Sequence, residues 1–201
     1  MTEEMQTKKI NLNKISQKDF SFIASQFKCG KTIVYPTDTI YGLGCDATNQ
    51  KAVDQIFKIK RRKKKQSLLV LVSSISMLKK YTYISKRQIE YLKKCWSGPV
   101  TVILKDRGRL AKNVASQEKS LAVRLPKSKF LTKMIREVGI PMVSTSINIS
   151  GKESILDPEK INKELGKEKP DVVIDAGILP QKKPSKIIDI RNIDNTIILR
   201  K

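Results

Sequence analysis

The sequence contains no histidine among its 201 residues. This absence excludes Ser-His-Asp and Cys-His catalysis, HExxH zinc sites and any mechanism that uses a histidine general base. If the chain is an enzyme, positioned charges, hydroxyl groups and backbone dipoles must supply its chemistry. Such groups suit reactions at phosphorus better than peptide hydrolysis.

Cysteine is also scarce, and the three that occur are widely spaced. Cys29, Cys45 and Cys95 form no CxxC pair, and their odd number suits free thiols in a reducing compartment. No apolar run approaches the roughly 20 residues of a membrane-spanning helix. The opening MTEEMQTKKI is too polar for a signal peptide. We therefore expect a cytoplasmic protein with no membrane partner.

Acidic residues are few, and the resulting positive charge raises the question of nucleic-acid binding. There are 41 lysines and arginines against 19 acidic residues, which gives a net charge of +22. Lysine dominates, with 32 lysines and 9 arginines spread along the whole chain, and such diffuse charge also arises from genome composition. Aromatic residues make up only 5%, which argues against sequence-specific stacking on single-stranded RNA. Contact with double-stranded RNA or tRNA stays open, and the basic run 60–65 is the best argument for it.

Apolar segments with strand and helix periodicity alternate along most of the chain, which predicts a single α/β domain with a mixed, twisted sheet. We expect residues 1–9 to be a loose tail and residues 10–201 to form the domain. Helical spacing occurs around residues 20–27, 52–57, 89–95 and 130–135, and Asp157-Pro158 is typical of a helix start. Strands are predicted at 31–36, 67–73, 99–105, 121–126, 141–146, 171–177, 186–190 and 196–200.

The segment YPTDTIYGLGCDATN, residues 35–49, follows the first predicted strand and is the most distinctive part of the chain. Alone it reads as a polar strand exit followed by a glycine turn. The nearby Gly30-Lys31-Thr32 resembles the end of a phosphate-binding P-loop, but that motif requires glycine at position 25, which is Ser25. The P-loop is therefore excluded.

Polar side chains gather where several predicted strands begin or end, and ligands bind at strand ends in open α/β sheets. Arg124 lies inside the apolar segment LAVRLP, where an unpaired charge would be costly. Each of these residues alone also has a structural explanation, such as turn chemistry, a solvated surface or a salt bridge. The set comprises Thr37, Asp38, Thr39, Lys60, Arg62, Arg124, Ser144, Thr145, Ser146, Asn148, Ser150 and Ser185.

Taken together, these residues resemble those of the YrdC-like threonylcarbamoyl-AMP synthases, of the short single-domain type. The resemblance spans roughly residues 10–200. The matching segments are PTDTIYGLGCDA, IFKIKRR with LLVLV, WSGPVTVIL, LAVRLP, STSINISG and PSKIIDI. The resemblance implies a twisted α/β sheet with flanking helices and a concave, positively charged cavity.

The resemblance also implies an activity. Such enzymes condense L-threonine, bicarbonate or CO2, and ATP into threonylcarbamoyl-AMP and pyrophosphate. A tRNA-threonylcarbamoyl transferase complex then passes the product to the adenosine next to the anticodon in tRNA. The alternative is a non-catalytic module that binds double-stranded RNA or tRNA.

By resemblance, Lys60 and Arg62 are catalytic and face the ATP phosphates or the carbamate. Mg2+ is expected to arrive with ATP, because substrate phosphates can supply most of its ligands, and no metal site of the protein itself is expected. The expected ATP-binding residues are Arg62, Gln66, Ser120, Ser146, Asn148, Ser154 and Arg200.

The threonine pocket is also assigned by resemblance. Arg124 is expected to hold the threonine carboxylate with its two-pronged guanidinium. Thr39, Ser144 and Ser185 are expected to complete this pocket.

The chain departs from the family pattern at several positions. The usual KxRPxxxPL has lost both prolines, Gln66 replaces a common asparagine, and Leu71 replaces a frequent histidine. Lys186 occupies the place of a threonine in the usual PST. These departures put the roles of positions 66, 71 and 186 in doubt more than they do the function.

Overall fold

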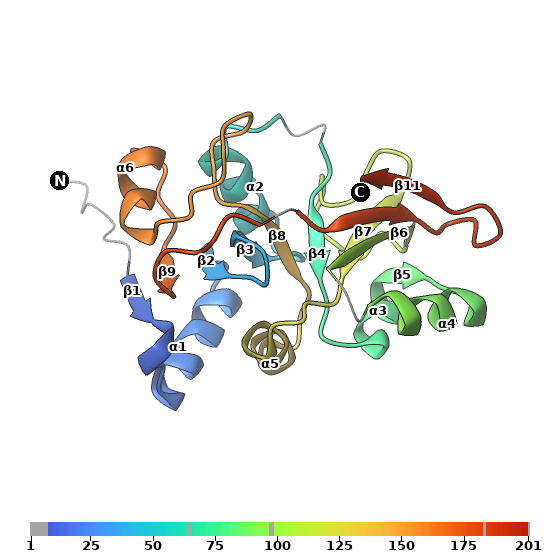
Figure 1. The fold of residues 1–201 in the computed structure, drawn as a ribbon, viewed down its shortest axis with the longest axis horizontal. Helices are drawn as coiled ribbons and strands as arrows, with labels where there is room; N and C mark the ends of the chain where they lie inside the picture. The colour runs from blue at the N-terminus through green and yellow to red at the C-terminus, as the bar shows by residue number, and fades with distance from the viewer. Residues whose placement is uncertain (1–7, 64–65, 97–98, 183, 201) are drawn as a thin grey trace.

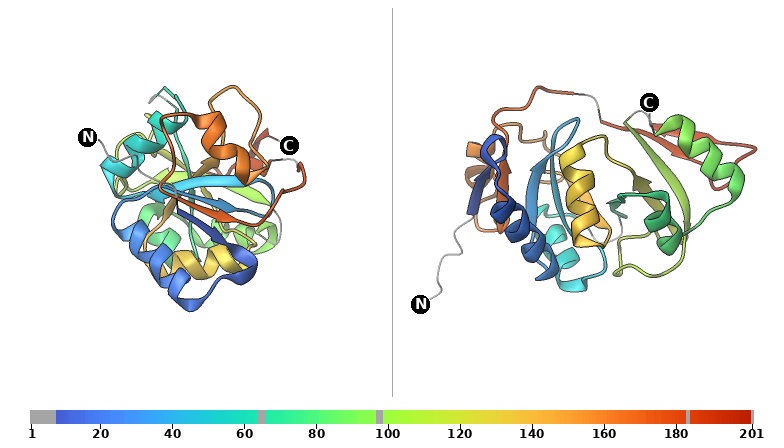
Figure 2. Two further views of the ribbon diagram at one scale, coloured as in Figure 1. Left: turned by 90° about the vertical axis from the view of Figure 1, so that its left-hand side faces the viewer. Right: turned by 90° about the horizontal axis from the view of Figure 1, so that it is seen from below.

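A twisted, mixed β-sheet runs through the molecule, with helices on both of its sides (Figure 1; Figure 2). The computed structural model describes residues 8–63, 66–96, 99–182 and 184–200. In order across the sheet, the strands are β1 (Lys8–Asn11), β9 (Val172–Asp175), β2 (Ile33–Pro36), β3 (Tyr41–Asp46), β8 (Met142–Ser146), β4 (Leu69–Leu71), β7 (Ser120–Arg124), β6 (Val100–Asp106), β10 (Lys186–Asp189) and β11 (Ile197–Arg200), and β5 (Thr82–Tyr83) pairs with β6.

Helices cover the sheet from both sides. In Figures 1 and 2, α1 and α5 lie together on one side, and α2 and α6 lie on the other. The helices are α1 (Gln17–Lys28), α2 (Gln50–Ile59), α3 (Ile75–Tyr81), α4 (Lys86–Cys95), α5 (Lys129–Val138) and α6 (Ile161–Leu165), with 3-10 turns η1 (Leu12–Lys14) and η2 (Pro158–Lys160).

The beginning of α1 shows why the helix forms where the sequence predicts it. The Ser16 hydroxyl accepts the Asp19 amide N–H at 3.1 Å, and the Asp19 carboxylate accepts the Ser16 amide N–H at 3.0 Å. This reciprocal capping box satisfies two amide groups that the first turn would otherwise leave unpaired. The apolar positions that follow, Phe20, Ile23, Ala24 and Phe27, are all buried.

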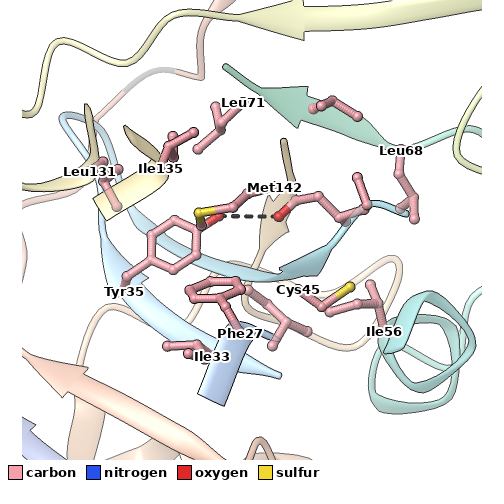
Figure 3. Close-up of a cluster of buried hydrophobic side chains, with 14 of the residues drawn as sticks. Phe27, Ile33, Tyr35, Cys45, Ile56, Leu68, Leu71, Leu131, Ile135 and Met142 are labelled. Carbon is pink, nitrogen blue, oxygen red and sulfur yellow. Dashed lines mark hydrogen bonds between the residues drawn. The ribbon is translucent and has the colours of Figure 1, made fainter. Parts of the chain in front are cut away.

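Part of the hydrophobic core lies between the sheet and helices α1 and α5. Figure 3 shows Phe27 of α1 and Leu131 and Ile135 of α5 packed near Tyr35 of β2 and Met142 of β8. All five side chains are fully buried.

Several sequence-based expectations need correction. The expected tail 1–9 is too long, because Lys8 and Lys9 belong to β1, which pairs in parallel with β9. The strand expected at 67–73 is only Leu69–Leu71, since the Leu68 amide N–H instead donates to the loop carbonyl of Val114. Asp157-Pro158 begins the 3-10 turn η2, and α6 follows it. Helix α3 and strands β3 and β5 were not predicted.

The two glycines of the 35–49 segment do not form a turn. Gly42 and Gly44 lie inside β3, which is buried along its whole length. A Cβ at Gly42 would lie 2.8 Å from Cε2 of Tyr35, and one at Gly44 would lie 2.2 Å from the Val143 carbonyl oxygen and 2.7 Å from the Tyr35 hydroxyl. These glycines therefore provide the space in which the Tyr35 ring crosses β3.

Gly44→Ala is expected to lower the free energy of unfolding by about 3 kcal/mol or more, because the new methyl group meets a backbone oxygen that cannot move aside. For Gly42→Ala, the three atoms nearest to the new methyl group all belong to the side chains of Tyr35 and Thr37. Urea unfolding of both variants, alone and combined with Tyr35→Leu, checks this. The smaller residue at 35 should relieve the Gly42→Ala cost and leave most of the Gly44→Ala cost. Equal relief at both positions would contradict the explanation.

Candidate active site

Lys60 lies at the C-terminal cap of α2 and is a buried lysine, with only 2% of its surface exposed. Its ammonium group donates to the Ser146 carbonyl at 2.6 Å, the Asn148 carbonyl at 3.2 Å and the Asn148 side-chain oxygen at 2.6 Å. All three acceptors are uncharged. Burial, helped by the positive charge of Arg62, lowers the pKa of Lys60 to about 8. The group is therefore mostly a cation at pH 7, with no described carboxylate neutralising it.

The loop after β8 is built around this ammonium group. The Ser146 hydroxyl donates to the Asn148 side-chain oxygen at 2.7 Å, and the Asn148 amide group donates to the Lys152 carbonyl at 2.6 Å. The Lys60 carbonyl in turn accepts the Ser150 amide N–H at 2.9 Å. We call Lys60, Ser146 and Asn148 the Lys60 cluster. Ser154, which was also expected in the site, lies near the Lys60 cluster. Its neighbour Ile155 donates its amide N–H at 2.9 Å to the carbonyl of Ile147, between Ser146 and Asn148.

Arg124, the last residue of β7, is buried with 5% exposure and forms an ion pair with Asp38. Asp38 lies in the turn between β2 and β3, which is held by the hydroxyl of Thr37. That hydroxyl donates to the Ile40 carbonyl at 2.6 Å and accepts the amide N–H groups of Thr39 and Ile40 at 3.1 Å each. The Thr39 hydroxyl lies 3.0 Å from that of Thr37. The acid of the 35–49 segment is thus the partner of the buried arginine.

Ser185 and Arg200 extend this region. The Arg200 guanidinium donates to the Ser185 carbonyl at 2.9 and 2.7 Å and to its hydroxyl at 3.3 Å. The Ser185 hydroxyl also lies 2.9 Å from that of Thr101. Burial, and then the positive charge of Arg124, lower the pKa of Arg200, so the two guanidinium groups lie within electrostatic range. We call Asp38, Arg124, Ser185 and Arg200 the Arg124 cluster.

Strand register relates Ser146, a member of the Lys60 cluster, to Arg124. Arg124 is paired with Leu71 in the β4–β7 ladder, and Leu71 is paired with Met142 in the β4–β8 ladder. Residues paired in a ladder point to the same face, as do residues two apart along a strand. Ser144 and Ser146, two and four residues after Met142, therefore share this face with Arg124.

Tyr35 is a residue of this region that the sequence analysis missed. Burial raises the pKa of its hydroxyl, while a hydrogen bond with Ser144 and the charge of Arg124 oppose this increase. The hydroxyl also donates to the Val143 carbonyl at 3.4 Å. Tyr35 thus contacts the buried Ser144 and lies within electrostatic range of Arg124. The pair of glycines opposite it was the available indication, because a large ring needs such space.

The remaining expected residues are Arg62, Gln66 and Ser120, and the described side-chain hydrogen bonds of Arg62 and Ser120 go to residues outside the two clusters. Arg62 donates to the Ser67 carbonyl at 2.8 Å, and Gln66 is exposed in the same loop. Burial lowers the pKa of Arg62. Ser120 lies at the other end of β7 from Arg124, with its hydroxyl 2.8 Å from that of Ser116. The binding roles expected for these residues stay predictions.

Among the described residues, no three or more histidine, cysteine, aspartate or glutamate side chains come close enough together to hold a metal ion. None of the described helices has the length and apolar character needed to cross a bilayer.

Comparison with known proteins identifies the family. The family model Sua5_yciO_yrdC, described as "Telomere recombination", matches residues 25–201. The chain belongs to the Sua5/YciO/YrdC family. Membership confirms the resemblance found in the sequence, and the fold matches Sua5 and YciO structures.

Members of the Sua5/YciO/YrdC family are similar to this chain over most of its length. A protein of Methanocaldococcus jannaschii is 36% identical over 185 residues, which cover 92% of this chain and 86% of that protein. A protein of Buchnera aphidicola named threonylcarbamoyl-AMP synthase is 34% identical, covering 87% of this chain and 95% of that protein.

Two solved structures of the Sua5/YciO/YrdC family show the same fold. The crystal structure of E. coli YciO matches with a TM-score of 0.84 and 27% identity, covering 98% of this chain and 95% of YciO. The crystal structure of P. abyssi Sua5 complexed with L-threonine matches with a TM-score of 0.85 and 26% identity, covering 97% of this chain. The chain spans 57% of that Sua5 chain.

Lys60→Met should change how stability depends on pH. The pKa of Lys60 falls from 10.5 to about 8 on folding. Between these values the unfolded chain keeps a proton that the folded chain has lost, so this lysine makes stability rise with pH. Relative to Lys60→Met, the wild type should gain about 2 kcal/mol of unfolding free energy between about pH 7 and 9.5.

Urea unfolding at both pH values measures this gain. Lys58→Met, at an exposed position of the same helix, controls for the loss of one lysine and should follow the wild type. If the curves of wild type and Lys60→Met run parallel, the lowered pKa of Lys60 is wrong.

Proposed function

We propose that this chain is an L-threonylcarbamoyladenylate synthase, which condenses L-threonine, bicarbonate or CO2, and ATP into threonylcarbamoyl-AMP and pyrophosphate. The observation that carries the proposal is Lys60, a buried ammonium group surrounded by neutral oxygens and joined through Asn148 to Ser146, whose side chain shares a sheet face with Arg124. Relatives named threonylcarbamoyl-AMP synthase support it, as does the similarity to a Sua5 structure complexed with L-threonine.

The chemistry explains why such cations are needed. The threonine amine adds to CO2 and loses a proton, and an oxygen of the resulting carbamate attacks the α-phosphorus of ATP. The bond from that phosphorus to the bridging oxygen breaks, and pyrophosphate leaves. Negative charge builds up on the phosphoryl oxygens and the leaving group, where Lys60 and Arg62 would stabilise it. Because no described carboxylate neutralises Lys60, its charge is available for this purpose.

The nucleotide is proposed to bind beside the Lys60 cluster. Mg2+ would come with ATP, with phosphate oxygens and water as most of its ligands. The residues proposed to surround the nucleotide are Arg62, Gln66, Ser120, Ser146, Asn148, Ser154 and Arg200.

The threonine is proposed to bind at the Arg124 cluster. Arg124 would hold its carboxylate, and Thr39, Ser144 and Ser185 would complete the pocket. Because Arg200 donates to Ser185 and lies near Arg124, it would stand where the amino-acid and nucleotide sites meet.

The product is proposed to pass to a tRNA-threonylcarbamoyl transferase complex that modifies the adenosine next to the anticodon, in the cytoplasm. Double-stranded RNA or tRNA remains a proposed further partner. It depends on the basic run 60–65, of which residues 64–65 lie outside the described residues. A purely RNA-binding, non-catalytic role would leave the carboxylate-free Lys60 without a purpose.

Pyrophosphate release tests the activity. The pure protein with Mg2+ and ATP should release pyrophosphate only when both threonine and bicarbonate are present. Lys60→Met should lower kcat about 100-fold or more, as the loss of one donor to the transition state typically does. Lys58→Met, on the same helix, should keep wild-type turnover. Pyrophosphate release that ignores threonine would overturn the proposal.

Arg124→Ala separates the two substrate sites. The KM for threonine should rise at least about tenfold more than the KM for ATP, because a charge-assisted pair with the carboxylate is lost. Steady-state kinetics with each substrate varied in turn measures both values. Arg87→Ala, which breaks the exposed ion pair with Asp194, should change neither. A larger effect on ATP would show that Arg124 belongs to the nucleotide site.

A further inference from the structure

The ion pair between Arg124 and Asp38 leaves one polar atom on each partner unused. Asp38 receives the Arg124 guanidinium on its Oδ2 atom. Its Oδ1 atom and the Nε atom of Arg124 are both buried and have no hydrogen-bond partner among the described residues. The side chains are only 19% and 7% exposed. Buried polar atoms without partners are costly, so these two atoms point to a ligand.

The two unused atoms have opposite character. Arg124 Nε is a cationic donor, and Asp38 Oδ1 is an anionic acceptor. An amino acid in its zwitterionic form presents the matching groups, a carboxylate and an ammonium, one carbon apart. Binding such a molecule adds no net charge to the buried pair.

A simple anion would bind here less well. Its negative charge would face the Asp38 carboxylate, and like charges in a poorly solvated site repel strongly. Lys182 donates to the Asp38 backbone carbonyl at 3.4 Å, and Arg200 lies near Arg124. These cations would attract small anions, so a carboxylate beside Arg124 is needed to discriminate against them.

We propose that Asp38 selects the zwitterionic amino acid: it closes off Arg124 when no substrate is present and binds the substrate α-ammonium through Oδ1 when one is. The substrate carboxylate then accepts from the unpartnered Nε atom of Arg124. The inference rests on the proposed function, to which it adds a residue that determines substrate class. Asp38 is thus more than an orienting partner of Arg124, which would require only Oδ2.

Wild-type protein alone tests the selection. Calorimetric titration compares L-threonine with 2,3-dihydroxybutyrate, in which a hydroxyl replaces the amine and the carboxylate remains. The wild type should bind L-threonine at least about tenfold more tightly, because only L-threonine has an ammonium group that can form a charge-assisted bond with Asp38. Equal affinity for the two ligands would overturn the inference without any variant.

Asp38→Asn assigns the selection to this residue. The variant should lose at least about tenfold in affinity for L-threonine, while its affinity for 2,3-dihydroxybutyrate stays equal or rises. Asp194→Asn makes the same chemical change in the exposed Arg87–Asp194 ion pair and should leave both affinities at wild-type values. Thermal unfolding confirms that each variant is folded.

The outcomes separate the two proposals. If the wild type releases pyrophosphate in response to threonine and Asp38→Asn keeps wild-type preference for the amino acid, only the inference fails. If Asp38→Asn loses affinity for both ligands equally, Asp38 merely orients Arg124 and the inference also fails. If the wild type neither binds threonine nor releases pyrophosphate with it, the proposed function fails as well.

Discussion

The ammonium group of Lys60 joins the end of α2 to the loop that follows β8. These two segments are separated by more than 80 residues of sequence, and hydrogen bonds to one nitrogen bring them together. Removing a lysine from water costs free energy, which the three oxygen acceptors only partly recover. The lowered pKa of Lys60 reflects this unrecovered cost of burying the charged form. The positive charge of Lys60 can therefore still attract a negatively charged ligand. The same hydrogen bonds fix the positions of Ser146 and Asn148.

The Arg124 cluster differs from the Lys60 cluster because its buried cation has a counter-ion. Here the buried cation is neutralised by a carboxylate from the turn between β2 and β3. The two clusters therefore differ in charge: among the described residues, Lys60 has no counter-ion and Arg124 already has one. Phosphate groups, which carry several negative charges, suit the first environment. A molecule without net charge suits the second.

Local features of the fold could be predicted from the sequence, and the site could be predicted only in part. The apolar spacing over residues 20–27 correctly indicated α1, because the interactions that form a helix, including the capping box at Ser16, lie within a few residues of one another. The family resemblance brought Lys60, Ser146 and Asn148 together, and the structure joins them by hydrogen bonds. Composition alone could not have paired them.

The ion pair between Arg124 and Asp38 was missed, as was the position of Tyr35 across β3. These contacts join residues 86 and 108 positions apart. They depend on the order of strands in the sheet, which no local pattern encodes. Gly42 and Gly44 were assigned to a turn for the same reason: glycine marks both a turn and a close approach, and only the neighbouring strand distinguishes them.

Strand β11 carries the arginine of the Arg124 cluster that bonds Ser185. Strand β11 is exposed along its whole length, yet Arg200 at its end reaches back to Ser185 and lies within electrostatic range of Arg124. Exposed strands at the edge of a sheet fray readily, so this arginine is held by one of the less protected parts of the molecule. A label or substitution in β11 would thus shift the Arg200 guanidinium and change the electrostatic environment of Arg124.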